Sequence, residues 1–69
     1  MGKLGDNIKM IRIAAGMSQQ EFAEKMNTNQ QHISGWERGV VEPSLYNILK
    51  IIKVLDTSFE ELTDGIEID

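Results

Sequence analysis

Cysteine is absent from this chain of 69 residues, which excludes disulfides and thiolate metal sites. The only histidine, His32, cannot build a zinc site by itself. No apolar run approaches the roughly 20 residues that a membrane-spanning helix needs, and the N-terminus lacks the apolar core of a signal peptide. We therefore expect one small domain over residues 1–69, in a reducing compartment such as the cytoplasm.

The usual catalytic arrangements are missing as well. The sequence has no Ser/His/Asp set, no glycine-rich phosphate loop, and no carboxylate pair with a plausible pocket. There is also no room for a separate ligand-sensing domain. We therefore expect neither enzyme activity nor a cofactor, a metal ion, a small-molecule ligand or a membrane partner.

Negative charge is unevenly distributed along the chain. The formal net charge is −4, which argues against a nucleic-acid partner at first sight, because phosphate binding favours a basic face. Residues 1–53, however, contain seven basic and five acidic side chains, whereas residues 54–69 contain six acids and no base. The acidity is mostly C-terminal, and residues 64–69 form an acidic tail that is either a solvated surface or a partner site.

Helical periodicity dominates the sequence. Three segments fit the capping-box pattern, in which a Ser or Thr is followed three residues later by Glu or Gln. These boxes begin at Ser18, Thr28 and Ser58. With Gly16, Asn27, Gly39, Asp56 and Gly65 as stops, the pattern predicts five helices, at about residues 4–15, 19–26, 29–38, 44–55 and 59–63.

Two short helices meeting across a turn of two or three residues, near Asn27, have the spacing of a helix-turn-helix. Apolar side chains give each helix an inner face. The residues expected there are Leu4, Ile8, Ile11, Ala15, Phe22, Ala23, Met26, Ile33, Trp36, Leu45, Ile48, Ile51, Ile52 and Leu55. At the C-terminus, Ile66 and Ile68 alternate with acids in a strand-like pattern, and they could pair across a two-fold axis or dock on the core.

The third helix presents an unusual polar side. With Ile33 and Trp36 inward, a period of 3.6 residues places Gln31, Ser34, Gly35 and Arg38 outward. Asn29 and Gln30 lie at its N-terminus, which is the end that enters the major groove in helix-turn-helix proteins. Gln and Asn can form paired hydrogen bonds with adenine there. The alternative is an ordinary solvated face.

Glu37 falls close to the buried side of the same helix. A nearly buried carboxylate needs a partner, and Arg12 is the obvious candidate. Exposure of Glu37 at the flank of the helix is the alternative. His32 lies beside the polar side and either touches a phosphate or has no role.

Residues 16–39, followed by Glu42-Pro43-Ser44 and the run 48–55, closely resemble the phage-repressor (Cro/C1) type of helix-turn-helix, also called the XRE family. The resemblance covers about residues 4–63. It implies an all-α fold, namely a compact five-helix, lambda-repressor-like DNA-binding domain. The matching positions include Gln19, Ala23, Ile33, the Trp36-Glu37-x-Gly39 group and Pro43.

The resemblance also implies roles for individual residues. Gln19 would contact a phosphate, and Thr28 and Arg38 would contact the DNA backbone. Arg12 and Glu37 would form an internal ion pair. The sequence departs from the family pattern at three places. Gly35 replaces a side chain that reads DNA bases, Ile52 replaces a small residue, and the loop 39–42 contains no Lys or Arg. The residues expected to meet bases are Asn29, Gln30, Gln31 and Ser34.

These observations leave two functions to weigh. The first is a transcriptional regulator of the repressor type. It would bind double-stranded operator DNA with paired half-sites as a homodimer formed by the fifth helix and the tail. The second is an antitoxin or adaptor that keeps the fold but uses its acidic surface on another protein. Salt-dependent binding to one DNA sequence distinguishes the first from the second.

Overall fold

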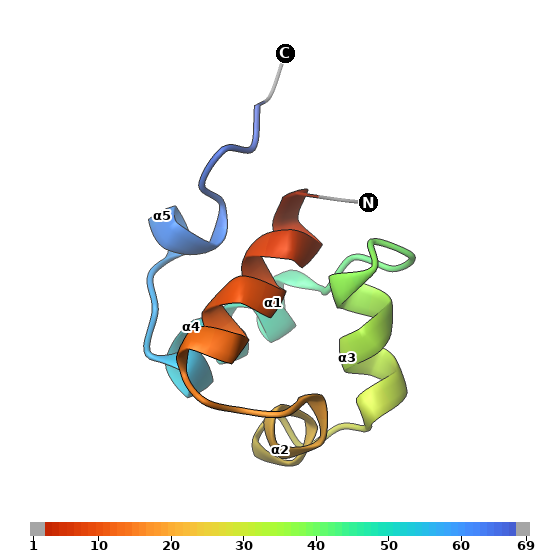
Figure 1. Cartoon of the computed structure of the whole chain (residues 1–69). Helices are drawn as coiled ribbons and strands as arrows, with labels where there is room; N and C mark the ends of the chain where they lie inside the picture. Colours follow the sequence, from red (N-terminus) through yellow and green to blue (C-terminus); the bar gives the residue numbers. More distant parts are fainter. Residues whose placement is uncertain (1–2, 68–69) are drawn as a thin grey trace.

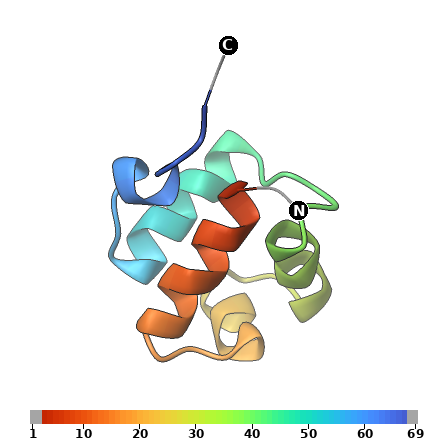
Figure 2. The same cartoon turned by 45° about the horizontal axis from the view of Figure 1, so that its top comes forward.

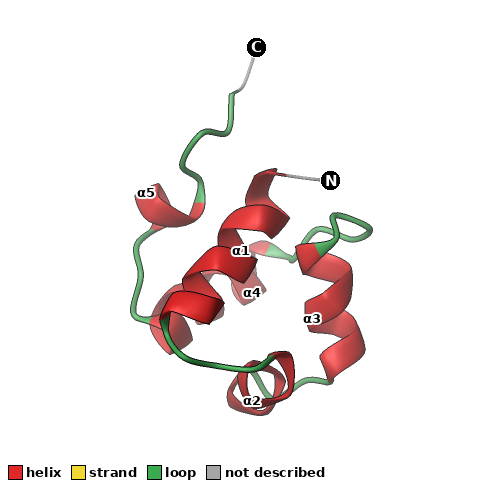
Figure 3. Cartoon of the chain, viewed as in Figure 1, coloured by secondary structure: helices red, strands yellow, loops and turns green. Residues whose placement is uncertain are grey.

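The computed structural model describes residues 3–67, and it contains five helices connected by short loops (Figure 1). Within these residues there is no strand (Figure 3), so the all-α prediction is confirmed. No helix among them is long and apolar enough to span a membrane. The helices are α1 (Lys3–Ala14), α2 (Gln19–Lys25), α3 (Gln30–Glu37), α4 (Leu45–Leu55) and α5 (Phe59–Leu62).

Local capping explains where the helices begin. The Ser18 hydroxyl accepts a hydrogen bond from the Glu21 amide, and the Glu21 carboxylate accepts one from the Ser18 amide, which completes the predicted capping box. At α5 the Ser58 hydroxyl accepts from the Glu61 amide, but the Glu61 carboxylate accepts from the hydroxyls of Thr57 and Ser58. The α5 cap is therefore only half of the predicted box.

The cap predicted for α3 is one residue too early. Asn29, not Thr28, is the N-cap, and its side chain accepts from the His32 amide at 2.9 Å. Asn27 takes the left-handed conformation (φ 60°) that closes α2. Thr28 and Asn29 both lie outside the helices, and α3 begins only at Gln30.

The core is formed where α1 lies between the other helices (Figures 1 and 2). Trp36 is 6% exposed and belongs to this core, as expected. The buried apolar side chains are Ile8, Phe22, Ala23, Met26, Ile33, Trp36, Ile51, Leu55 and Leu62.

Two of the predicted inner positions are wrong. Leu45 is 67% exposed, because the buried side of α4 is centred on Ile51 and Leu55, and Leu45 lies well off that direction in the first turn. Ala15 is exposed just beyond the end of α1. The strand-like pattern also fails at Ile66 and Glu67, which are coil, while Ile68 lies outside the described residues.

Candidate nucleic-acid interface

The turn between α2 and α3 contains Met26, Asn27, Thr28 and Asn29. The Thr28 amide donates to the Ala23 carbonyl at 2.9 Å, which fixes the direction in which the chain leaves α2. Asn29 then caps α3, and Asn29 and Gln30 are both exposed at this end of the helix. The two helices with this tight turn have the geometry of a helix-turn-helix (Figure 1).

The N-terminal part of α3 presents polar side chains without an acid. Asn29, Gln30 and Gln31 are exposed, and the first turn of α3 contains no Asp or Glu. Arg38 is exposed at the C-terminal cap, and Ser34 is half-buried between these ends. Such a surface offers donors and acceptors to base edges and does not repel phosphate.

Thr28 and His32 are tied to each other beside this surface. The Thr28 hydroxyl lies 2.6 Å from His32 Nδ1. Thr28 is half-buried and His32 is exposed. The contact accounts for the position of His32 without a ligand.

Gly35 does not belong to the exposed side, contrary to the expectation from the helical period. It is buried, because the loop after α3 folds back over it and the Val40 and Val41 amides both donate to the Gly35 carbonyl. The sequence predicts a loop after the third helix, but its local pattern does not indicate that the loop covers Gly35.

A chain of polar side chains connects the core to the exposed end of α3. Arg12 Nε lies 2.6 Å from Glu37 Oε2 and Arg12 Nη2 lies 3.2 Å from Glu37 Oε1, in the pairing that the sequence predicts. Gln19 Nε2 donates to Glu37 Oε1 at 3.0 Å. Gln30 Nε2 in turn donates to Gln19 Oε1 at 3.2 Å. Gln30 is thus held by a series of contacts that begins at a buried ion pair.

This series fixes which way the Gln30 amide points. Because a carboxylate can only accept, Gln19 must turn its NH₂ group toward Glu37 and leave its own oxygen to Gln30. Gln30 must then use one N–H on Gln19, and its oxygen and second N–H remain available. Sequence reasoning found each of these residues but not the connection among them, because it depends on the packing of α1, α2 and α3.

Two further polar contacts hold the surrounding helices. Asn7, which is buried, donates from Nδ2 to the carbonyls of Leu62 and Asp64, both at 2.9 Å, and so ties α5 to α1. Lys50 Nζ donates to the Met26 carbonyl at 2.7 Å, at the C-terminal end of α2. Neither was identified from the sequence. A polar Asn7 directly beside the core residue Ile8 was the available signal for the first.

The described residues do not bring together three His, Cys, Asp or Glu side chains in a way that could hold a metal ion. Comparison with known proteins supports the identification of α2 and α3 as a helix-turn-helix. The helix-turn-helix family profile matches residues 8–62 of the chain.

Curated relatives and solved structures agree with this match. The HTH-type transcriptional regulator ImmR of Bacillus subtilis is 34% identical over 59 residues, which is 86% of this chain and 46% of the relative. An uncharacterized HTH-type transcriptional regulator of Rickettsia prowazekii is 27% identical over 93% of this chain and 49% of its own length. The chain therefore spans about half the length of the curated relatives it matches.

Two solved structures have the same architecture over nearly the whole chain. The restriction-modification controller protein C.AhdI from Aeromonas hydrophila has a TM-score of 0.82 and 37% identity, with 87% of each chain covered. The P22 c2 repressor in complex with a synthetic operator has a TM-score of 0.83 and 28% identity, with 94% of this chain and 98% of that chain covered. The chain belongs to the helix-turn-helix family of the phage-repressor (XRE) type, with a lambda-repressor-like fold.

Proposed function

We propose that this chain binds double-stranded DNA in a sequence-specific manner through the N-terminal part of α3 and acts as a transcriptional regulator, with repression as its mode. One observation carries the proposal: Gln30 is exposed at the N-terminal end of α3, whose first turn contains no acid, and it is oriented by Gln19 and Glu37. Family membership, with relatives that are transcriptional regulators, supports it. The nucleoid, and so the cytoplasm, would be its place of action.

Each residue at the interface has a distinct part in this proposal. Asn29, Gln30, Gln31 and Ser34 meet base edges in the major groove. The oxygen and remaining N–H of Gln30 match the N6 donor and N7 acceptor of adenine. Gln19, through its second amide N–H, together with Thr28 and Arg38, contacts the DNA backbone.

Selection of bound sequences from a random DNA pool, followed by substitution, tests the base-reading role. Gln30→Ala should weaken binding to the selected site by about 1–3 kcal/mol and relax the preference at one base pair. Gln20→Ala is the matched control, because Gln20 is exposed on the neighbouring helix α2 but is not in the proposed interface. If Gln30→Ala and Gln31→Ala both leave affinity for the selected site unchanged, these residues do not read bases.

We also propose that the chain binds paired half-sites as a homodimer. The sequence suggests α5 and the tail as the contact, and we add to it the exposed apolar side chains of α4. We propose that these side chains together form the interaction surface, because exposed apolar side chains that gather in one patch mark such sites. Its members are Leu45, Tyr46, Leu49, Phe59 and Ile66.

Analytical ultracentrifugation tests the dimer. Leu49→Glu should shift the protein to the monomer and weaken binding to a site with two half-sites about 34–36 Å apart. Ile13→Glu, on an exposed apolar residue of α1, is the control. A wild-type protein that sediments as a monomer at high micromolar concentration, with and without DNA, contradicts the dimer.

The adaptor function is the second candidate, and the acidic C-terminal block is the observation that favours it. A null result in the DNA selection, together with tight binding to a protein, would favour that function.

A further inference from the structure

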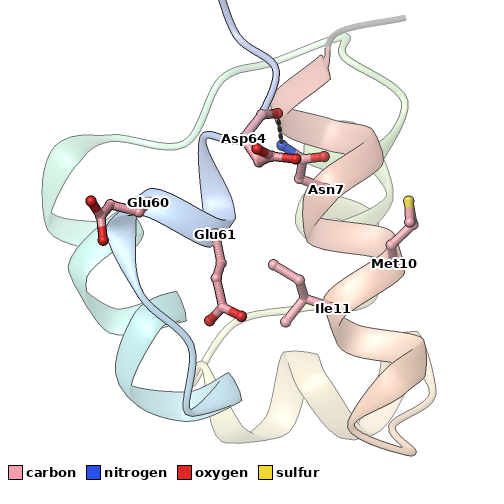
Figure 4. Close-up of a pocket in the computed structure, with 6 residues that line it drawn as sticks. All are labelled: Asn7, Met10, Ile11, Glu60, Glu61 and Asp64. Carbon is pink, nitrogen blue, oxygen red and sulfur yellow. Dashed lines mark hydrogen bonds between the residues drawn. The ribbon is translucent and has the colours of Figure 1, made fainter.

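A groove runs along the side of α1 that faces α5 (Figure 4). It consists of two neighbouring pockets, one beside α5 and one beside the loop between α4 and α5, which share Ile11 and Glu61. Along α1 the lining extends from Asn7 to Ala15, which corresponds to about 12 Å of helix. We call this surface the α1–α5 groove.

The α1 wall of the groove is apolar. Met10 is 68% exposed, Ala14 is exposed, and Ile11 is half-buried between them. These residues are spaced by one and then three positions, so they form a single stripe along the helix. Ile11 packs partly against the core, and Met10 and Ala14 on either side of it are left exposed by the other residues of 3–67.

The opposite wall is acidic. Asp56, Glu61 and Asp64 line it, and no Lys or Arg lines either pocket. Glu61 extends toward Ile11, whereas Glu60 points away from the groove (Figure 4). Within residues 3–67 the only ion pair between side chains is Arg12–Glu37, so the carboxylates of this wall lack a cationic partner there.

The groove faces away from the proposed DNA interface. Gly5 is the point where α1 touches α3: a Cβ at Gly5 would come within 2.4 Å of the Trp36 carbonyl oxygen. Ala14 is nine residues further on, which places it half a turn around the helix from Gly5. Both views of the fold accordingly show α3 and α5 on opposite sides of α1 (Figures 1 and 2).

We propose that the α1–α5 groove binds a short cationic amphipathic helix of a partner protein. The apolar side of such a helix packs on Met10, Ile11 and Ala14, as in other helix-in-groove complexes. Its Lys or Arg side chains meet Glu61 and Asp64 across the groove, where complementary charge favours association and excludes acidic partners.

Charge selects this occupant over a second copy of the chain. Two copies meeting groove to groove would bring their Asp56, Glu61 and Asp64 walls together, and neither pocket has a Lys or Arg in its lining to offset that repulsion. The inference does not depend on DNA binding, because the groove and α3 lie on different sides.

A designed peptide tests the proposal on the full chain. The probe is a capped helix of about two heptads that contains only Leu and Lys, with Leu at helical spacing. Binding is followed by fluorescence anisotropy and by backbone amide NMR shifts, in the absence of DNA. We expect saturable binding, with shifts concentrated in residues 10–15 and 60–64. A scrambled peptide of the same composition should bind about tenfold more weakly.

Two substitutions in the groove are compared with one elsewhere. Asp64→Lys and Ala14→Lys place a positive charge in the groove at exposed positions and should each weaken binding about tenfold. Glu24→Lys makes the same charge change as Asp64→Lys on α2, outside the groove, and should change affinity by less than about twofold. Circular dichroism shows that each variant is folded.

Three results would overturn the proposal. The first is an equal loss of affinity in Glu24→Lys, which would reveal non-specific attraction by net charge. The second is a set of shifts on α3 or α4 in place of α1 and α5. The third is the appearance of the groove shifts when the protein alone is concentrated, which would assign the groove to a second copy. Failure of DNA binding in the separate selection experiment changes none of these readouts.

Discussion

At the scale of single residues, Glu37 lies at the buried end of the polar series and accepts three of its hydrogen bonds. Its carboxylate accepts from Arg12 and Gln19, and its side chain is only 2% exposed. Glu37→Ala leaves the buried Arg12 guanidinium without an anion, so we expect the free energy of unfolding to fall by about 3–5 kcal/mol. Urea denaturation measures this loss.

Glu24→Ala is the control for that measurement, because Glu24 is exposed on α2 and its removal should change stability by no more than about 0.5 kcal/mol. A loss below about 1 kcal/mol for Glu37→Ala would mean that the Arg12 side chain finds water or another acceptor. It would also remove the basis for the fixed orientation of Gln30.

Alanine substitution at two glycines should change the stability of the fold in opposite directions. A Cβ at Gly5 would lie 2.4 Å from the Trp36 oxygen and 2.6 Å from the Glu37 oxygen, so α1 and α3 must separate. We expect Gly5→Ala to destabilise the fold by about 1–3 kcal/mol. At Gly35 the nearest atom is Val41 Cγ2 at 4.0 Å. Gly35→Ala should therefore stabilise the protein by about 0.5–1 kcal/mol through helix propensity.

Thermal denaturation of both variants checks this pair, and a lower melting temperature for Gly35→Ala would contradict the inference that a Cβ fits at that site without a clash. The sequence could place Glu37 near the buried side and name Arg12 as its partner, because both follow from helical period and the need to pair a charge. It could not distinguish Gly5 from Gly35. Their difference lies in what each one faces, which is backbone oxygens at Gly5 and the Val41 side chain at Gly35.

At the scale of helices, the N-terminus of α3 shows how neighbouring cap-forming residues compete. Asn27, Thr28 and Asn29 all suit a helix end, and Asn29 takes the role predicted for Thr28. Asn29→Ala should lower stability by about 1 kcal/mol. Thr28→Ala should lower it by less, because the Thr28 hydroxyl contacts only the exposed His32 ring.

Thermal unfolding without DNA compares the two variants, so that any role in base reading does not enter. The reverse order of stability would restore Thr28 as the cap.

The number of helices was predictable because caps and stops are local signals. The exposed side of α4 was not, since Leu45 and Ile51 are equally apolar and only the direction of the core separates them.

At the scale of the whole molecule, the distribution of charge limits how the protein can hold DNA. The acid-free side of α3 and the acidic α1–α5 groove lie on opposite sides of α1. The sequence shows that the acids gather at the C-terminal end of the chain. It does not show that this end folds onto the side of α1 opposite to α3. That outcome depends on α5 packing beside α1 through Asn7.

The salt dependence of DNA binding follows from that distribution. Arg38 is the only cation among the residues proposed to contact DNA, since Gln19 and Thr28 are neutral. We expect log affinity to fall with log salt at a slope of about −1 per subunit, or about −2 for a dimer, because each neutralised phosphate contributes roughly −0.9. Titration of the selected site at several salt concentrations measures the slope.

Arg38→Gln should remove most of this slope, whereas Lys9→Gln, on the exposed surface of α1, should leave it unchanged. A wild-type slope as steep as about −6 would require several more basic contacts than α3 and its flanks supply. Lys25 would then be the next residue to substitute, because it ends α2 immediately before the turn and is exposed. A shallow slope combined with sharp sequence preference means that amide contacts to bases, rather than phosphate attraction, supply the specificity.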